Sequence, residues 1–290
     1  MVSEVIDRSP RFQGILDRLS AKSIDDYYNP YRIFEWPDQL PEDMWWMSPE
    51  LTTAHDTELA DSLSTEQLQT LSRYESINFY SLNVHGIREL LVEVVNRIHT
   101  KGFEAPSEFF HHFIGEENEH MWFFAEFCLR YGNGKIYRQP AGGSGAVPSP
   151  KVESLLVFAR IMIFEELVDH YNSTMAADER LHETIRGINR IHHQDESRHI
   201  AFGRELVQLL FEDVRRTATE AELDGVSHYL KRYMTHSFES MYHPQVYRDA
   251  GIDNPHEVRR TLLASPARHR AEERTFRKTA KFLQKTGIIR

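Results

Sequence analysis

Two Glu-x-x-His pairs, each set in an apolar helical stripe, constrain the fold of this chain most strongly. One pair is Glu117 and His120; the other is Glu196 and His199, with His192 four residues upstream. Residues three and four apart share a helix face, so each set would place its polar side chains together among apolar ones. A buried carboxylate needs a compensating cation. Four-helix bundles build two-metal carboxylate sites from such pairs.

The whole chain, 1–290, is interpreted as one all-α domain built around a four-helix bundle. Residues 1–63 are rich in Pro, Trp and Tyr and predict an irregular N-terminal arm. Residues 64–216 predict the bundle, with helices over about 64–100, 107–131, 152–177 and 181–216. The Gly- and Pro-rich stretch 139–150 predicts a long crossover between the second and third helices. Residues 217–290 predict a C-terminal helical extension.

Composition narrows the possible functions. The charge is −10, from 34 Lys and Arg against 44 Asp and Glu, and no basic run is set among aromatic residues, so a nucleic-acid partner is not expected. No apolar stretch reaches spanning length and no leader is visible, so we expect a cytoplasmic protein without a membrane partner. The single cysteine, Cys128, excludes a thiolate metal site.

The other two helices offer pairs of candidate carboxylates. On the third helix, Glu165 is favoured over Glu166 because its stripe is more apolar and it lies as far from the interhelical turn as Glu196. On the first helix, Glu89 is favoured because it stands about as far from the turn near residue 101 as Glu117 does. Glu93, one turn away, is the alternative.

Chance is a competing explanation for these pairs, because the chain has sixteen His. Two further Glu-x-x-His pairs are interpreted as solvated or capping: Glu108 with His111 lies on the opposite side of its helix, and Glu179 with His182 falls in a polar turn. Other residues are expected to support the ligands rather than bind metal. These supporting residues are His85, Asp195 and Arg198.

The segment Asp195-Glu-Ser-Arg198-His199 resembles the fourth helix of ferritin-like diiron proteins. With the additional His192, the chain resembles the p-aminobenzoate (arylamine) N-oxygenase family over most of its length, including the arm from Tyr28 to Pro49. The resemblance implies a ferritin-like bundle with seven ligands, in which Glu117 and Glu196 bridge two metals. The implied ligands are Glu89, Glu117, His120, Glu165, His192, Glu196 and His199.

Mixed carboxylate and imidazole ligation suits iron or manganese better than zinc, magnesium or calcium. The resemblance implies two iron ions that activate O₂ as a peroxo-diferric species and oxidise an amine to hydroxylamine, nitroso or nitro products. It also implies a homodimer. Electrons for reducing the metal pair would come from a ferredoxin-like protein, a reductase or the substrate itself. No cofactor-binding fingerprint is present, so the donor must be separate.

Several alternatives stay open. A diiron C-hydroxylase or desaturase would use the same ligands, and a non-catalytic iron-handling bundle would need no substrate. A ribonucleotide reductase small subunit is disfavoured, because Phe124 stands where its radical tyrosine would be. Phe113, Phe124 and Phe158 are expected to wall an aromatic pocket or to be plain core, and neither an aryl nor an aliphatic amine can be chosen from them.

Overall fold

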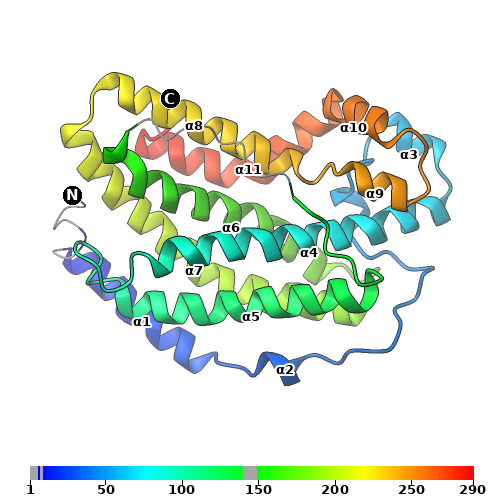
Figure 1. Cartoon of the computed structure of the whole chain (residues 1–290), viewed down its shortest axis with the longest axis horizontal. Coiled ribbons are helices and arrows are strands. Elements are labelled where there is room, and N and C mark those ends of the chain that lie inside the picture. Colours follow the sequence, from blue (N-terminus) through cyan, green and yellow to red (C-terminus); the bar gives the residue numbers. More distant parts are fainter. Residues whose placement is uncertain (1–5, 7–8, 140–148) are drawn as a thin grey trace.

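The computed structural model describes residue 6, residues 9–139 and residues 149–290. These residues form helices and no sheet; their only bridge pairs Trp45 with Leu181. Four long helices lie side by side at the centre of the molecule (Figure 1). They are α4 (Thr65–Val95), α5 (Ser107–Tyr131), α6 (Glu153–Ala177) and α7 (Glu183–Thr217).

The bundle consists of two antiparallel hairpins, α4 with α5 and α6 with α7, as the sequence predicts. The predicted capping box at Ser64 is confirmed: its hydroxyl accepts from the Gln67 amide at 3.2 Å, and the Gln67 side chain accepts from the Ser64 amide at 2.9 Å. The crossover between α5 and α6 is confirmed as a long connection over 132–152. Residues 140–148 of that connection lie outside the described part of the chain.

Helix α6 is the centre of the core. Its buried residues lie on all sides of the helix rather than on one stripe, because α4, α7, α8 and α11 all pack against it. Ligand-type side chains on α6 are therefore shielded from water. The flanking helices are α1 (Pro10–Asp25), α2 (Pro30–Ile33), α3 (Glu58–Ser62), α8 (Glu220–Glu239), α9 (Pro244–Asp249), α10 (Pro255–Leu263) and α11 (Pro266–Thr286), with short 3-10 turns η1 (Pro49–Leu51) and η2 (Pro150–Val152).

The expectation of an irregular arm over 1–63 needs correction, because 16 of its residues form α1. Ser9 caps this helix by accepting from the Phe12 amide at 3.2 Å, and Pro10 follows as its first residue. Buried Phe12 and Leu16 hold α1 against α5 and α7. Most residues of this segment are polar, and the apolar residues that form the buried stripe are too few to predict a helix from the sequence. In Figure 1, α1 and α2 run along the outer side of α5 and α7.

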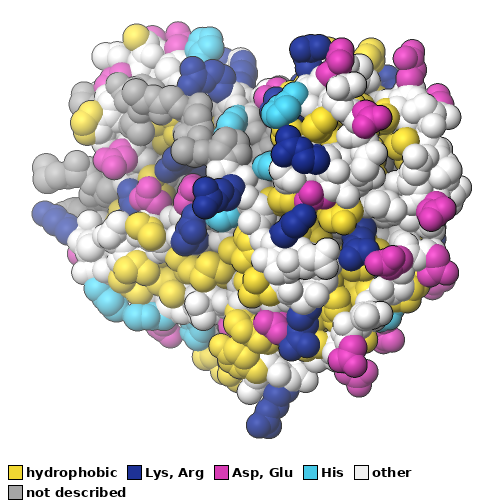
Figure 2. Space-filling model, turned by 45° about the vertical axis from the view of Figure 1, so that its right-hand side comes forward, with side chains coloured by type: hydrophobic (Ala, Val, Ile, Leu, Met, Phe, Trp, Pro, Cys, Tyr) yellow, Lys and Arg dark blue, Asp and Glu magenta, His cyan; other side chains and the backbone are white. Residues whose placement is uncertain are grey.

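The surface is mixed in character. Figure 2 shows acidic and basic side chains interspersed on one face, with hydrophobic side chains gathered in its lower half. In the described part of the chain, no helix combines the length and the apolar character that crossing a membrane requires.

Candidate metal centre

Six of the seven expected ligands converge between α5, α6 and α7. In four of them, Glu117, His120, Glu196 and His199, one ligand atom each lies within 4.8 Å of the others. Glu165 approaches from α6, with its Oε2 3.9 Å from His199 Nδ1. His192 joins from α7, with its Nε2 2.8 Å from Glu196 Oε1. All six side chains are buried, so the set is sealed from bulk water.

Glu117 and Glu196 occupy the middle of the cluster. Glu117 Oε1 lies 3.3 Å from His120 Nδ1 and 2.7 Å from His199 Nδ1. Glu196 Oε1 lies 3.8 Å from His120 Nδ1 and 3.7 Å from His199 Nδ1. Glu117 thus faces two imidazoles and Glu196 faces all three, positions that suit carboxylates shared between two ions.

Each imidazole has one nitrogen toward the carboxylates and the other against a supporting side chain. His120 Nε2 lies 3.0 Å from Asp195 Oδ2, and His199 Nε2 lies 2.8 Å from Glu116 Oε2. The amide of Asn172 contacts His192 Nδ1. Such outer contacts fix the ring orientation and the tautomer of a metal-binding histidine. The inward atoms are therefore His120 Nδ1, His199 Nδ1 and His192 Nε2.

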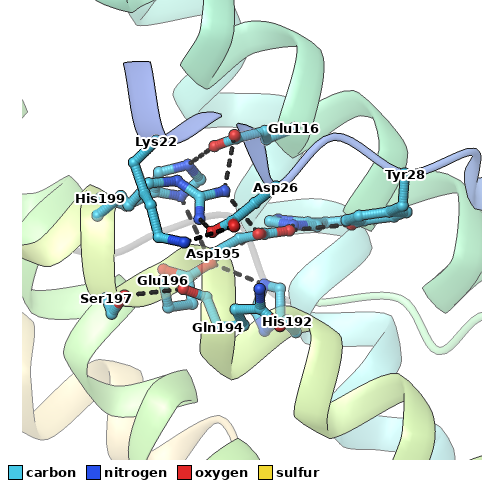
Figure 3. A network of polar contacts seen from close by, with 12 residues as sticks. Lys22, Asp26, Tyr28, Glu116, His192, Gln194, Asp195, Glu196, Ser197 and His199 are labelled. Atoms are coloured by element: carbon cyan, nitrogen blue, oxygen red, sulfur yellow. Dashed lines mark hydrogen bonds and ion pairs between the residues drawn. The ribbon is translucent and has the colours of Figure 1, made fainter. Parts of the chain in front are cut away.

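Arg198 ties the supporting carboxylates together. Its guanidinium donates to Asp195 Oδ1 at 2.6 Å, to Glu116 Oε1 at 2.7 Å and to Asp26 Oδ2 at 3.1 Å. The hydroxyl of Tyr28 donates to Asp195 Oδ2 at 2.9 Å. Figure 3 shows Asp26 and Tyr28 of the N-terminal segment reaching this network beside His199 and Glu196. The supporting roles expected of Asp195 and Arg198 match this geometry.

Charges inside the cluster shift the ionisation of its members. Burial alone would lower the pKa of His120, but the Glu117 and Asp195 carboxylates outweigh it and raise that pKa to about 10. Burial and the charges of Glu196 and Glu117 raise the pKa of Glu165. Burial also opposes ionisation of Glu196, yet nearby His192 holds its pKa well below the usual range. Without metal, protons therefore occupy this site, and a metal ion must displace them.

Unpaired buried atoms show that the cluster fits a metal better than a network of hydrogen bonds. Within the described residues, Glu117 Oε2, Glu165 Oε1 and Glu196 Oε2 are buried without a hydrogen-bond partner. His199 Nδ1 and Glu196 Oε1 have charged neighbours at 2.7 and 2.8 Å, but these contacts lack the geometry of a hydrogen bond. Leaving such atoms unsatisfied is costly. Carboxylate oxygens and imidazole nitrogens that converge without forming hydrogen bonds to one another are ligand atoms that Fe²⁺ or Mn²⁺ would satisfy.

The expectation for the first helix needs correction, because Glu89 is exposed and does not join the cluster. It lines a surface groove of about 430 Å³ together with Glu93. Glu93 is engaged by Arg97 at 2.7 Å and lies 3.6 Å from Arg160. Counting from the turn estimated the level of Glu89 along the bundle but not the face of the helix, since each residue step rotates by about 100°. The buried residues near that level are Ile87 and Leu90.

The choice of Glu165 over Glu166 agrees with the structure. Glu166 faces away from the cluster and accepts from Arg204 at 2.7 and 2.9 Å and from the Thr279 hydroxyl at 2.7 Å. The ion pair with Arg204 links α6 to α7, and the hydrogen bond from Thr279 links α6 to α11. These contacts explain why two adjacent buried carboxylates on one helix have separate roles.

The remaining expected residues divide into two groups. The Phe113 ring lies 4.5 Å from the His199 ring, and the Phe124 ring lies 4.8 Å from the His192 ring, so both border the cluster. Phe158 instead stacks on Phe110 in a more distant aromatic group. His85 lies against the Tyr137 carbonyl at 3.0 Å, away from the ligands, so the supporting role expected for it is not seen.

The two other Glu-x-x-His pairs lie outside the cluster, as expected. Glu108 and His111 are exposed, and His111 contacts His99. His182 caps α7 by accepting from the Thr184 amide at 3.2 Å.

Sequence reasoning missed four supporting residues: Glu116, Asn172, Asp26 and Tyr28. Glu116 is next to Glu117 on α5, and Asn172 lies one helical turn from Val168 on α6. Their partners, His199 and His192, lie on α7, and the spacing of residues within one helix does not predict contacts with another helix. Asp26 and Tyr28 are about 170 residues from their partners on α7. No local signal marks such contacts.

Comparison with known proteins gives a family. The family model described as P-aminobenzoate N-oxygenase AurF matches residues 10–287. The chain belongs to this family. It is therefore an oxidoreductase of the diiron oxygenase type, and its ferritin-like fold is the one the sequence predicts. No curated protein matches the chain.

Solved structures agree on the fold. A variant of an R2-like ligand-binding oxidase with an aerobically reconstituted Mn/Fe cofactor has a TM-score of 0.52 at 13% identity, covering 98% of this chain and 94% of that one. A second variant, with an anaerobically reconstituted Mn/Fe cofactor, has a TM-score of 0.51 at 14% identity with the same coverage. At such identities the similarity shows the fold alone.

Proposed function

We propose that this protein is an O₂-dependent N-oxygenase that uses two iron ions to oxidise an aromatic amine to hydroxylamine, nitroso or nitro products. The observation that carries the proposal is the set of three buried carboxylates and three buried imidazoles that meet with five of their atoms outside any hydrogen bond of normal geometry. Family membership adds the reaction class. The six residues that would hold the metals are Glu117, His120, Glu165, His192, Glu196 and His199.

The position of each ligand in the cluster predicts how it would bind the two ions. Glu117 and Glu196, at the centre, would be shared by the two ions. Glu165 and the three imidazoles would complete the shells from outside. When bound, the iron pair supplies electrons to O₂, which is chemistry that amino-acid side chains do not provide. No carboxylate comes from α4, so we propose six protein ligands for this chain, one fewer than its sequence resemblance implies.

The protein's own contribution is orientation and exclusion of water. Asp195, Glu116 and Asn172 hold the three rings with their inward nitrogens toward the carboxylates. Phe113 and Phe124 cover the ligand imidazoles on two sides. An aromatic wall of this kind suits the ring of an arylamine and excludes water that would quench an oxidised centre.

The test is a single turnover in defined components. Protein loaded anaerobically with two Fe²⁺ per chain is mixed with O₂ and p-aminobenzoate, and products are separated by chromatography and identified by mass. N-oxygenated products are expected from the native protein and not from Glu196→Ala. The matched control Glu179→Ala changes an exposed carboxylate and should keep activity. Ring-hydroxylated products would favour a C-hydroxylase, and an unchanged amine with stored ferric iron would favour an iron-handling protein.

Metal identity is tested in parallel. The similar R2-like oxidases carry a Mn/Fe cofactor, so protein loaded with equal Mn²⁺ and Fe²⁺ is compared with protein loaded with Fe²⁺ alone. We expect the iron-only form to give the N-oxygenated product. Activity restricted to the mixed form would contradict the two-iron assignment.

A further inference from the structure

Helix α11 presents a basic face on an acidic protein. Its exposed cations recur at helical spacing while the whole chain carries a charge of −10. In the described part of the chain, Arg274, Arg277 and Lys278 have no hydrogen-bond or ion-pair partner. We call the exposed cations of this helix the α11 basic face. Its residues are Arg270, Arg274, Arg277, Lys278, Lys281 and Lys285.

This face borders a groove of about 370 Å³ between α6, α7 and α11. Arg274, Arg277 and Lys278 line the groove together with the serines Ser173 and Ser197. The acids at the groove are already engaged, since Glu166 is bound by Arg204 and Asp169 contacts His193. The groove lining carries four cations, Arg204, Arg274, Arg277 and Lys278, against the two acids Glu166 and Asp169, so its net charge is positive.

The charge of these cations is felt inside the groove. Burial lowers the pKa of His170, and the nearby Arg274, Lys278 and Arg277 lower it further. His170 is therefore neutral, so it can still form hydrogen bonds at the groove but adds no charge to it. The field at this place is set by the α11 side chains, which a negatively charged partner would neutralise.

The groove adjoins the metal cluster along α6 and α7, because residues that line it neighbour cluster residues in the sequence. Glu166 in the groove follows Glu165 in the cluster, and Ser197 in the groove follows Glu196. Asp169, also in the groove, is close enough for the Glu196 charge to contribute to the rise of its pKa, which burial dominates. In Figure 1, α11 runs beside α6. An electron donor placed here would contact the same two helices, α6 and α7, that supply Glu165, Glu196 and His199 to the cluster.

We propose that the α11 basic face and its groove dock an acidic electron-donor protein of the ferredoxin type. This inference rests on the proposed function, because a diiron oxygenase must be re-reduced. Two donor molecules each lose one electron, and two ferric ions each gain one, with no bond formed between the proteins. Charge complementarity selects the occupant: the donor supplies carboxylates to the unpaired cations.

Complex formation is the primary test, because it does not depend on metal. Metal-free protein is titrated with an acidic plant-type [2Fe–2S] ferredoxin at low and high salt, and the Kd is measured. The variant Arg277→Glu/Lys278→Glu reverses the groove charge. The control Arg18→Glu/Lys101→Glu reverses two exposed cations outside α11, with the same change in net charge. We expect the groove variant to weaken binding about tenfold or more at low salt, and the control to stay within about twofold of native.

Electron transfer gives the second readout. Reduced ferredoxin should reduce the ferric protein more slowly in the groove variant than in the native protein, whereas dithionite with methyl viologen should reduce both equally. Equal ferredoxin rates or affinities in the native protein and the variant, including no binding by either, would overturn the docking proposal. Tight binding of inorganic phosphate to the groove without ferredoxin binding would assign a small-anion site instead. Failure of the chemical reductant with both proteins would count against the proposed function.

Discussion

His120 Nε2 lies 3.0 Å from Asp195 Oδ2, so an acid from α7 fixes the ring that α5 sends into the metal cluster. The charge of Asp195 is secured from the other side by Arg198 at 2.6 Å. Although burial opposes ionisation, His120 and then Arg198 keep the pKa of Asp195 low, at about 2. The ring is thus held by an acid that stays ionised across the working pH range.

We therefore predict that Asp195→Asn weakens metal binding by about 10- to 100-fold, because the imidazole loses the anion that orients it and strengthens its basicity. A competition titration of Fe²⁺ against a chromophoric chelator measures this. Asp213→Asn, a change of the same kind farther along α7, serves as the control. Equal affinities for the two variants would mean that Asp195 does not position the ring.

The corrected placement of Glu89 leads to a paired prediction. Glu165→Gln should lower the iron content and the apparent metal affinity, because it removes one of three buried carboxylates from the cluster. Glu89→Gln should change neither, because this side chain is exposed. Elemental analysis after anaerobic loading and desalting measures both variants. A loss of iron in Glu89→Gln would restore the seven-ligand set.

Gly86 allows a close approach of α4 and α6. A Cβ at this position would fall on the ring of Phe164, whereas a Cβ at Gly115 on α5 would meet no other atom within 4 Å. We predict that Gly86→Ala destabilises the protein by about 1–3 kcal/mol through overpacking. Gly115→Ala should be neutral or stabilising by up to about 1 kcal/mol, because alanine favours the helix. Urea unfolding of both variants provides the measurement.

Glu75 gives a pH prediction away from the metal cluster. It is buried, it accepts from the Thr53 amide at 3.1 Å, and burial raises its pKa to about 8 from 4.5. The folded state holds this proton while the unfolded state loses it above pH 4.5, so stability should fall between about pH 4.5 and 8. The loss attributable to this group is on the order of 4–5 kcal/mol at most.

The matching variant is Glu75→Gln, which mimics the protonated acid. Unfolding of metal-free protein at pH 5 and pH 8 should show a smaller loss of stability in this variant than in the native protein. A native protein that gains stability over this interval relative to the variant would reverse the sign and contradict the assignment.

Much of the bundle could be predicted from sequence because its signals are local. The Ser64 capping box, the glycines after Tyr131 and the apolar stripes fixed the four helices to within a few residues, apart from the end of α4. The pairs on α5 and α7 were visible because three- and four-residue spacing shares one helix face. Glu165 could be predicted as the candidate on the third helix because its stripe is more apolar than that of Glu166.

The rest depended on tertiary geometry. The prediction that Glu89 joins the cluster was wrong. The distance of a residue from a turn predicts its height along the bundle, but it does not predict which face of the helix the residue occupies. The contacts of Tyr28 with Asp195 and of Glu116 with His199 join segments that are distant in sequence. Spacing within one segment carries no information about them.

Anomalous diffraction from crystals of the iron-loaded protein, recorded at the iron edge, tests the central claim most directly. We predict two iron peaks per chain, both enclosed by Glu117, His120, Glu165, His192, Glu196 and His199, with no contact from α4. A single peak, no peak among these six side chains, or a peak bound by Glu89 or Glu93 would contradict the account.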